Sequence, residues 1–267
     1  MNKVKSIRGM HDLTGEDYLI QNTIKNKFEK FAYNYNFKPL ITPIMEFSDI
    51  FNRTLGNSSD VVMKEMYTFL DRSEESLTLR PEGTAGIARA IISNGLTQSL
   101  PLKFYYYGPM FRYERPQKGR LRQFTQIGVE MFADTTFFRD YEVIQFAFKF
   151  LKNLNISDNL ALQINNLGNY NDRAKYIEEL KKYYLKFKHQ LSKDSIIRLE
   201  KNPLRILDSK DSCDIEINKN APAIGNFISN SSKEYFDNLK NLLQKTNISY
   251  SENFQLVRGL DYYSNTI

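Results

Sequence analysis

The stretch LKFYYYGPMFRYERPQKGRLRQFTQIGVEMFA, from Leu102 to Ala133, constrains the fold of this chain more than any other. Two runs rich in aromatic and β-branched residues, which favour strands, flank the basic loop Arg115–Arg122. This pattern predicts a long antiparallel hairpin. The chain has 267 residues, which is enough to bury one large core or two modest ones around such a hairpin.

The second strand of this hairpin has two chemically different faces, because successive side chains of a strand point to opposite sides. One face is predicted to pack against the core, and its residues are Thr125, Ile127, Val129 and Met131. The other set is polar and consists of Gln126, Gly128 and Glu130. Gly128 leaves the backbone bare between an amide and a carboxylate, so a small polar ligand could bind there.

The end of the first strand and the loop add charge to this polar face. Arg112 and Glu114 share one face of the first strand. The loop cations could hold a phosphate chain or an RNA backbone, and they are Arg115, Lys118, Arg120 and Arg122. The alternative is a solvated polar face beside a solvated basic loop. Burial of Arg112, Gln126 and Glu130 beside one another would favour a binding site.

The sequence TLRPEGTAG, Thr78–Gly86, brings another carboxylate to a turn at which a helix is predicted to begin. Glu82 could accept a hydrogen bond from an ammonium group, and Thr84 could supply a hydroxyl. The alternative is an ordinary helix start, in which Thr84 is the N-cap and the proline and glycines form the turn.

Helices and strands are mixed irregularly along the chain, which predicts an α+β fold with an antiparallel sheet. An amphipathic helix is expected over Glu16–Phe37, and a strand on either side of a polar turn at Asp71–Ser76. Charged helices predominate from Asn169 to Tyr250, and strand chemistry returns in NFQLVRGLDYYS. We therefore expect a core at residues 1–168, a mostly helical insertion at 169–250, and a return to the core at 251–267.

Composition excludes several classes of protein. The single cysteine, Cys213, cannot form an internal disulfide or a Cys-rich zinc site, so a reducing, cytoplasmic location is expected. No apolar run is long enough to span a membrane, and the N-terminus lacks the apolar region of a signal peptide. The chain contains no P-loop and no GxGxxG motif, and its two distant histidines do not predict a metal site. A net charge of +6 fits a polyanionic partner, although a lysine-rich composition would give the same value.

These segments together resemble the histidyl-tRNA synthetases, a family of class II aminoacyl-tRNA synthetases, from Ile7 to the last residue. ITPIMEFSDIF resembles class II motif 1, and the hairpin sequence resembles motif 2. TLRPEGTAG and LVRGLDYYS resemble the family's histidine-binding signatures, and KNPLRILDSK resembles part of its insertion domain. Motifs 1 and 2 are moderately specific, and their combination with RGLDYY in this order is very specific.

The resemblance implies an antiparallel catalytic sheet flanked by helices, with motif 1 at a homodimer interface. It implies that L-histidine and ATP, with Mg²⁺ on the phosphates, form histidyl-adenylate. Histidine would then be transferred to the 3′ end of tRNA(His). No membrane partner is expected.

The resemblance also implies a set of histidine-binding residues. Glu82, Thr84 and Gln126 would hold the α-ammonium, and Glu130 and Tyr263 would contact the two edges of the imidazole. The complete set is Glu82, Gly83, Thr84, Arg112, Gln126, Glu130, Arg258, Tyr262 and Tyr263.

For ATP the resemblance implies contacts from Arg112, Glu114, Arg120 and Phe124, with Phe124 stacked on adenine. Arg112 and Arg258 would be the catalytic residues, and Arg258 would replace a metal ion that other class II enzymes use. The chemistry suits a guanidinium, because the reaction brings a carboxylate and a phosphate together and a fixed cation neutralises both.

The family pattern continues beyond RGLDYYS with further strands, motif 3 and an anticodon-binding domain, which are not in this sequence. We therefore expect a C-terminally truncated synthetase with an incomplete catalytic fold, whose isolated chain shows little ATP–pyrophosphate exchange. Two alternatives remain open. One is the synthetase-like regulatory subunit of ATP phosphoribosyltransferase, which tends to lose the signature residues. The other is a non-catalytic fragment that binds histidine or RNA.

Overall fold

The computed structural model describes residues 4–56, 59, 61–156, 159–258 and 263–267, which form two compact units. The first unit contains Met1–Asp134 and Lys152–Leu154, and the second contains Thr135–Leu151 and Asn155–Ile267. These units are defined by packing, and their limits differ from the predicted segment boundaries after residues 168 and 250. The predicted boundaries stay predictions. The α+β class expected from the sequence is confirmed.

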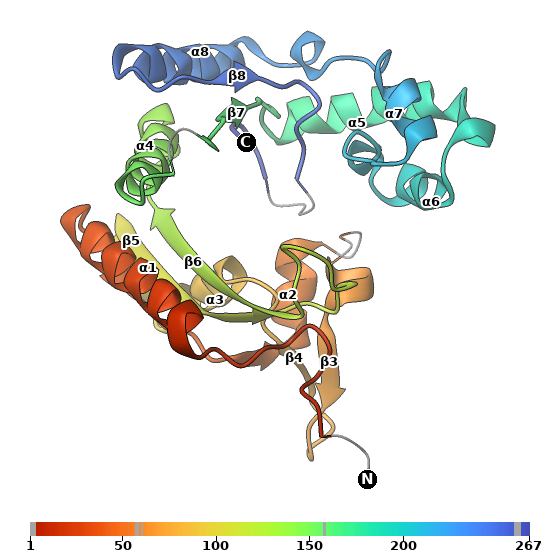
Figure 1. Ribbon diagram of the computed structural model, residues 1–267. Coiled ribbons are helices and arrows are strands. Elements are labelled where there is room, and N and C mark those ends of the chain that lie inside the picture. The colour runs from red at the N-terminus through yellow and green to blue at the C-terminus, as the bar shows by residue number, and fades with distance from the viewer. Residues whose placement is uncertain (1–3, 57–58, 60, 157–158, 259–262) are drawn as a thin grey trace. The chain divides into compact units, whose positions relative to one another are not determined.

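The first unit is built on the predicted hairpin (Figure 1). Strands β5 (Leu102–Phe111) and β6 (Gln123–Phe132) pair antiparallel along their whole length, with Tyr106 opposite Gly128. Strand β1 (Lys38–Pro39) adds a short parallel neighbour to β5. The sheet is therefore mixed. The long hairpin is confirmed, whereas a strand of two residues carries too little pattern to be predicted.

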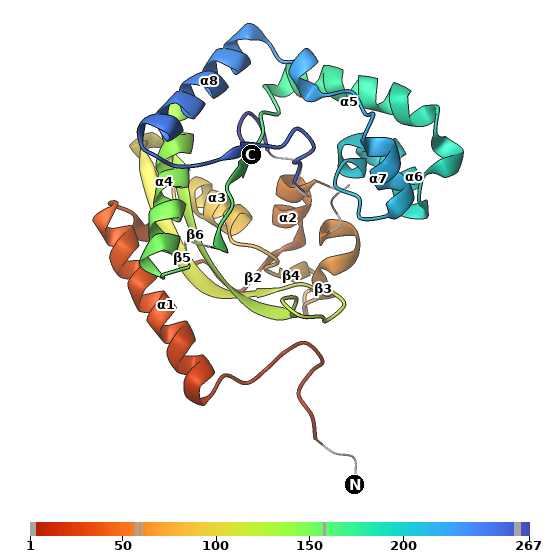
Figure 2. The same cartoon turned by 45° about the horizontal axis from the view of Figure 1, so that its top comes forward.

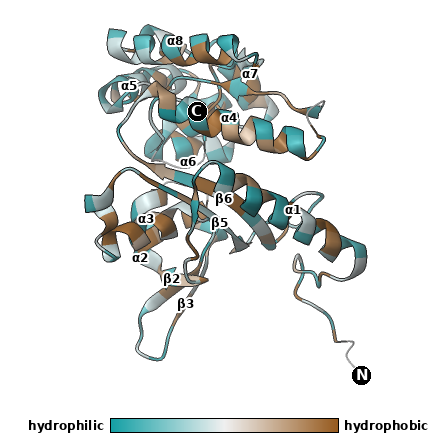
Figure 3. Ribbon diagram, turned by 90° about the vertical axis from the view of Figure 1, so that its left-hand side faces the viewer, coloured by the Kyte–Doolittle hydropathy of each residue, from teal (hydrophilic) through white to brown (hydrophobic). Residues whose placement is uncertain are grey.

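Two helices cover opposite faces of the hairpin (Figures 1 and 2). On one face, α1 (Gly15–Asn34) places Phe28 edge-on against Tyr105. On the other face lies α3 (Thr84–Ser93), which is apolar over much of its length (Figure 3). Ile87 and Ile91 of α3 form a buried cluster with Phe104, Tyr106 and Met110 of β5.

The predicted core face of β6 needs a correction. The predicted core residues lie on the side of the hairpin that α1 covers, where Gln21 donates a hydrogen bond to Thr125. Thr125 is exposed, and the other three, Ile127, Val129 and Met131, are only half-buried. The polar set of β6 shares its face with the buried residues of β5, because Gly128 lies opposite Tyr106. The alternation within β6 alone could not show which face its partner strand buries.

A second sheet has the antiparallel order β2–β4–β3, with β2 (Met45–Phe47), β3 (Tyr67–Leu70) and β4 (Ser76–Leu79). The predicted turn between β3 and β4 is confirmed, and the Asp71 carboxylate accepts backbone hydrogen bonds from Ser73 and Glu75 there. Three short helical segments complete the unit: α2 (Ser48–Leu55), a π-helical turn (Val61–Glu65) and a 3₁₀ turn (Leu96–Ser99).

The two faces of this second sheet have opposite chemistry. One face is polar and buried, and Thr78 bonds there to the hydroxyls of Ser48 and Thr68 at 2.8 and 2.9 Å. The other face is apolar and partly exposed; we call it the apolar sheet face. Its residues are Met45, Phe47, Tyr67, Phe69, Leu77 and Leu79, of which Met45, Phe47 and Phe69 are 48%, 54% and 42% exposed.

The second unit is mostly helical, which confirms the helices predicted between Asn169 and Tyr250. Its helices are α4 (Phe137–Asn153), α5 (Tyr170–Leu185), α6 (Lys193–Lys201), α7 (Ser212–Asn218) and α8 (Asn230–Lys245), with 3₁₀ turns at Lys188–Gln190, Pro203–Ile206 and Ile224–Asn226. β7 (Gln163–Ile164) and β8 (Ser251–Glu252) form a short parallel pair. No helix among the described residues is long and apolar enough to cross a membrane.

A buried carboxylate connects the beginnings of α6 and α7. Asp214 accepts hydrogen bonds from the hydroxyls of Ser192, Ser195 and Ser209, each at 2.6 Å. Burial alone would raise the pKa of Asp214, but these hydrogen bonds outweigh it and lower the pKa below its usual value. The side chain is therefore held as an ionised acceptor.

The last described residues pair with the segment that precedes α5. The backbone groups of Asn165 and Ile267 exchange two hydrogen bonds of 2.9 Å, and Leu167 N–H donates to the Asn265 carbonyl at 2.7 Å. Val257 and Arg258 lie in irregular backbone, so the strand predicted there is wrong for these two residues. The rest of that predicted strand falls largely on residues 259–262, which lie outside the described residues.

Candidate active site

The turn before α3 and the middle of β6 meet at a direct hydrogen bond. Thr84 Oγ1 donates to Glu130 Oε1 at 2.6 Å. The two residues are 46 positions apart in the sequence, and both belong to the predicted histidine-binding set. The fold therefore brings together two motifs that the sequence could only place separately.

Glu82 is buried and caps α3. Its carboxylate accepts hydrogen bonds from the backbone N–H groups of Thr84 and Ala85, at 2.7 and 2.8 Å. Gly83 is the N-cap residue and Thr84 is already helical, so the alternative in which Thr84 is the N-cap is wrong. An anionic carboxylate is favourable at this position because the first N–H groups of a helix lack intrahelical partners.

Tyr106 fills the space that the sequence predicted to be bare. A Cβ atom on Gly128 would lie 2.3 Å from the Tyr106 ring, and a Cβ atom on Gly83 would lie equally close to it. The ring therefore lies between the two glycines and is 6% exposed. The bare patch over Gly128 is thus occupied by the chain itself. The cross-strand register is the sequence signal that indicates this, because it places Tyr106 opposite Gly128.

The Tyr106 hydroxyl reaches the same carboxylate as Thr84 does. Tyr106 forms a side-chain hydrogen bond with Glu130, and this bond favours the ionised carboxylate. Burial, together with the nearby Glu82 carboxylate, nevertheless raises the pKa of Glu130 to about 7. Burial also raises the pKa of Glu82, against its backbone hydrogen bonds. Two carboxylates thus lie close together in a poorly solvated place.

Gln126 supplies an acceptor that is still available. Its Oε1 atom is buried and has no hydrogen-bond partner among the described residues. Gln126 and Glu130 point to the same face of β6. Arg112, Gln126 and Glu130 are each half-buried. Their burial beside one another as a single binding site stays a prediction.

Arg112 directly follows β5, and two contacts hold its side chain. Its Nε donates to the Pro81 carbonyl at 2.8 Å, and its guanidinium lies 5.4 Å from the centre of the Phe124 ring. Its positive charge lowers the pKa of Glu82, although less than the backbone hydrogen bonds do. Arg112, the predicted phosphate contact, thus lies against Phe124, the residue predicted to stack on adenine.

The basic loop is exposed but ordered by specific contacts. Arg120 forms an ion pair with Glu114 at 2.9 Å, and the Arg122 guanidinium stacks 3.9 Å from the centre of the Tyr113 ring. The backbone N–H of Arg122 donates to the Gly9 carbonyl at 2.8 Å. Two predicted ATP contacts, Glu114 and Arg120, therefore occupy one ion pair in this structure.

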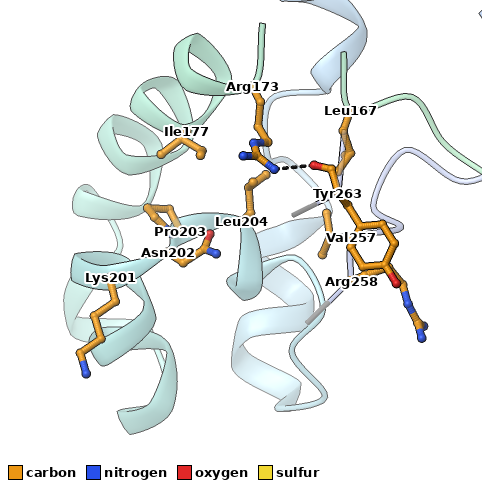
Figure 4. Close-up of a pocket in the computed structure, with 10 residues that line it drawn as sticks. All are labelled: Leu167, Arg173, Ile177, Lys201, Asn202, Pro203, Leu204, Val257, Arg258 and Tyr263. Carbon is orange, nitrogen blue, oxygen red and sulfur yellow. Dashed lines mark hydrogen bonds between the residues drawn. The ribbon is translucent and has the colours of Figure 1, made fainter. Parts of the chain in front are cut away.

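Arg258 and Tyr263 lie in the second unit and line a cavity of about 220 Å³ there (Figure 4). The cavity also has two cations, Arg173 and Lys201, and an apolar wall of Leu167, Ile177, Pro203, Leu204 and Val257. Arg173 donates to the Tyr263 carbonyl. The predicted grouping of Arg258 and Tyr263 with Glu130 stays a prediction, and Tyr262 lies outside the described residues.

The described part of the first unit therefore offers two carboxylates, a hydroxyl and an unpartnered amide oxygen at one end of α3. These are acceptors suited to a ligand that carries N–H donors and positive charge. Among the described residues, no group of three His, Cys, Asp or Glu side chains could hold a metal ion.

Comparison with known proteins assigns the chain to a family. The model of the histidyl-tRNA synthetase family matches residues 9–201. The histidine–tRNA ligase of Mycoplasma mobile is 47% identical over 264 residues, which are 99% of this chain. The chain belongs to the histidyl-tRNA synthetase family. The corresponding ligase of Rickettsia prowazekii is 46% identical over the whole chain.

Solved structures support the fold. The apo histidyl-tRNA synthetase of S. aureus superposes with a TM-score of 0.77 at 34% identity, over 99% of this chain and 60% of that one. A Bacillus halodurans protein described as an ATP phosphoribosyltransferase regulatory subunit/histidyl-tRNA synthetase has a TM-score of 0.70 at 22% identity, which shows a common fold only. The chain spans 59% of the Mycoplasma mobile ligase and 65% of the Rickettsia prowazekii ligase. The resemblance stated from the motifs is confirmed, as is the class II fold.

Proposed function

We propose that this synthetase-family chain contributes the amino-acid site of a histidine–tRNA ligase. The reaction would join L-histidine to ATP as histidyl-adenylate, with release of pyrophosphate, and then pass the histidyl group to the 3′ end of tRNA(His). The observation that carries the proposal is the hydrogen bond between Thr84 and Glu130, because it unites two separate signatures of the family at one place.

The amino acid would be recognised through its nitrogen atoms. Gln126 Oε1 is free to accept from the α-ammonium, and the Glu82 carboxylate and Thr84 hydroxyl lie at the start of α3 as further acceptors. Glu130 would accept from one imidazole N–H, and Tyr263 would bond to the other ring nitrogen. A site of this kind rejects apolar analogues by about 10⁴ or more, because its polar groups would be left unpaired.

The nucleotide would be bound at the other end of β5. Phe124 would stack on adenine, and Arg112 and Arg258 would neutralise the α-phosphate as the histidine carboxylate attacks it. Loss of one such electrostatic contact typically lowers the rate by about 10²–10³. Arg120 would leave its ion pair with Glu114 to contact the outer phosphates. The described residues do not fit a resident metal ion, so Mg²⁺ is proposed as part of the ATP substrate.

The test is calorimetric binding of L-histidine, histidinol and L-phenylalanine to the chain at pH 8. L-histidine and histidinol should bind, because both carry the ammonium and the imidazole, and L-phenylalanine should not. Glu130→Gln should weaken L-histidine binding by about tenfold or more, since a buried hydrogen bond to a charged group is lost. Glu75→Gln, at the exposed β3–β4 turn, is the matched control. Equal affinity for histidine and phenylalanine would contradict the proposal.

We also propose that the protein is a homodimer through the apolar sheet face. A sheet that buries its polar face and exposes its apolar face has the reverse of the arrangement expected for an isolated chain in water. The face is continuous across three strands and includes Met45 and Phe47 of the segment that resembles motif 1. A second copy of the same face would cover it. Translation in the cytoplasm is the setting in which this activity is proposed.

A further inference from the structure

We propose that Tyr106, which the motifs do not assign to the site, is a positioning residue that keeps the Glu130 carboxylate ionised and aimed. The inference rests on the proposed function for its ligand, histidine. Its structural basis is independent of that ligand, because it consists of contacts within the first unit.

Two glycines fix the Tyr106 ring. Because a Cβ atom on either Gly83 or Gly128 would lie 2.3 Å from the ring, neither position can carry a side chain while the ring stays in place. Gly128 is the cross-strand partner of Tyr106, and Gly83 belongs to the turn before α3. The ring is thus held between the strand and the turn that carry Glu130 and Thr84.

This placement brings two hydroxyl donors to one carboxylate. Thr84 donates to Glu130 at 2.6 Å, and the Tyr106 hydroxyl donates to the same side chain. Hydroxyl donors stabilise the ionised form of a carboxyl group. They oppose burial and the neighbouring Glu82 carboxylate, both of which favour the protonated form.

Two arginines also act on the groups around Tyr106 and Glu130. Arg112 acts on Glu82, and Arg80 interacts electrostatically with Tyr106. Arg80 is buried and fixed by hydrogen bonds to the carbonyls of Pro109 and Thr42, at 2.9 and 2.8 Å. Neither arginine is a direct partner of Glu130 in this structure. The two hydroxyls are therefore the groups that favour the ionised form of Glu130, against burial and the Glu82 carboxylate.

The consequence concerns the ionisation of Glu130 near neutral pH. With both donors in place, burial still raises the pKa of Glu130 to about 7. Tyr106→Phe keeps the ring between the glycines and removes one donor. The pKa of Glu130 should then rise by about one unit, because the ionised carboxylate loses a hydrogen-bond donor that stabilises it.

The decisive experiment is an NMR titration of the Glu130 carboxyl carbon in selectively labelled full chain, assigned with Glu130→Gln. Tyr106→Phe should move the midpoint upward by about one unit. Tyr105→Phe, the same change on the opposite face of the same strand, should leave it unchanged. An unchanged midpoint in folded Tyr106→Phe would overturn the inference.

Histidine binding gives the second readout. If the Glu130 pKa rises by about one unit from 7, Tyr106→Phe should weaken binding by about fivefold at pH 7 and much less at pH 9. The ratio of wild-type to variant affinity removes the ligand's own titration from the comparison. A loss of equal size at both pH values would indicate a purely steric role and overturn the inference. Absence of histidine binding by the wild-type chain would instead overturn the proposed function, and the NMR titration would still decide the role of Tyr106.

Discussion

At the scale of residues, the site is defined by carboxyl groups placed where water solvates them poorly. Glu82 is used twice, as the cap of α3 and as a neighbour that disfavours the charge of Glu130. Such groups make stability depend on pH, because protons bind the folded and unfolded chains with different affinity.

Glu130 should make the protein more stable in mild acid than in mild base. Its folded pKa of about 7 is above the ordinary glutamate value of 4.5, so its contribution is fully present below pH 4.5 and is lost as the pH rises through 7. We expect Glu130→Gln to remove this part of the pH dependence. Urea unfolding of both proteins at pH 5 and pH 8 measures this dependence. If the free energy of unfolding changed between the two pH values by the same amount in the variant as in the wild type, the expectation would be contradicted.

Gln126 should show a conflict between stability and binding. A buried polar atom without a partner costs roughly 1–3 kcal/mol, so Gln126→Leu should raise the free energy of unfolding by about 1 kcal/mol. The same change should abolish measurable L-histidine binding. Thermal unfolding and calorimetry test the two halves separately. Gln123→Leu, at an exposed position of the same strand, is the control for the gain in hydrophobicity.

At the scale of elements, the strands and turns that could be predicted are those with a long or distinctive sequence pattern. The hairpin follows from ten-residue strands of alternating chemistry, and the β3–β4 turn follows from Asp71, whose side chain forms the turn. The two-residue strands β1, β7 and β8 have no such pattern. They arise because distant segments are brought together by packing.

The candidate site was predicted from motifs, and its internal contacts were not. The alternation of β6 gave its polar set correctly, but the occupant of the space over Gly128 comes from β5. Likewise, Thr84 has the residue type of an N-cap, and Glu82 takes that task because the turn directs its carboxylate to the helix end. Tertiary placement decided both cases.

Asp214 should be the side chain on which the start of α7 most depends. We expect Asp214→Asn to destabilise the chain by about 2–3 kcal/mol, because three hydroxyls, of which that of Ser195 is fully buried, lose a charged acceptor. Since the pKa of Asp214 is lowered, its contribution is present at neutral pH and is lost as the pH falls below about 3.8. Urea unfolding at pH 7 checks the loss. Asp208→Asn, at an exposed position, should change the midpoint little.

At the scale of the whole molecule, the apolar sheet face should determine the assembly. Phe47→Glu places a charge on that face and should convert a dimer into a monomer, because an unpaired charge is costly at a buried interface. Light scattering after size-exclusion chromatography measures the mass directly. Ile197→Glu, which changes an exposed apolar residue of α6, should leave the mass unchanged. A wild-type mass near the 31.3 kDa of one chain would contradict the proposed dimer.

The ring between two glycines also predicts how mutations combine. In a library that varies positions 83, 106 and 128, a side chain at either glycine should be tolerated only together with a smaller residue at 106. The three positions should therefore show strong epistasis, since residues in contact do not contribute additively. Relatives and designed variants should exchange these residues as a set, and any variant that regains bulk at 83 or 128 will have to hold Glu130 by other means.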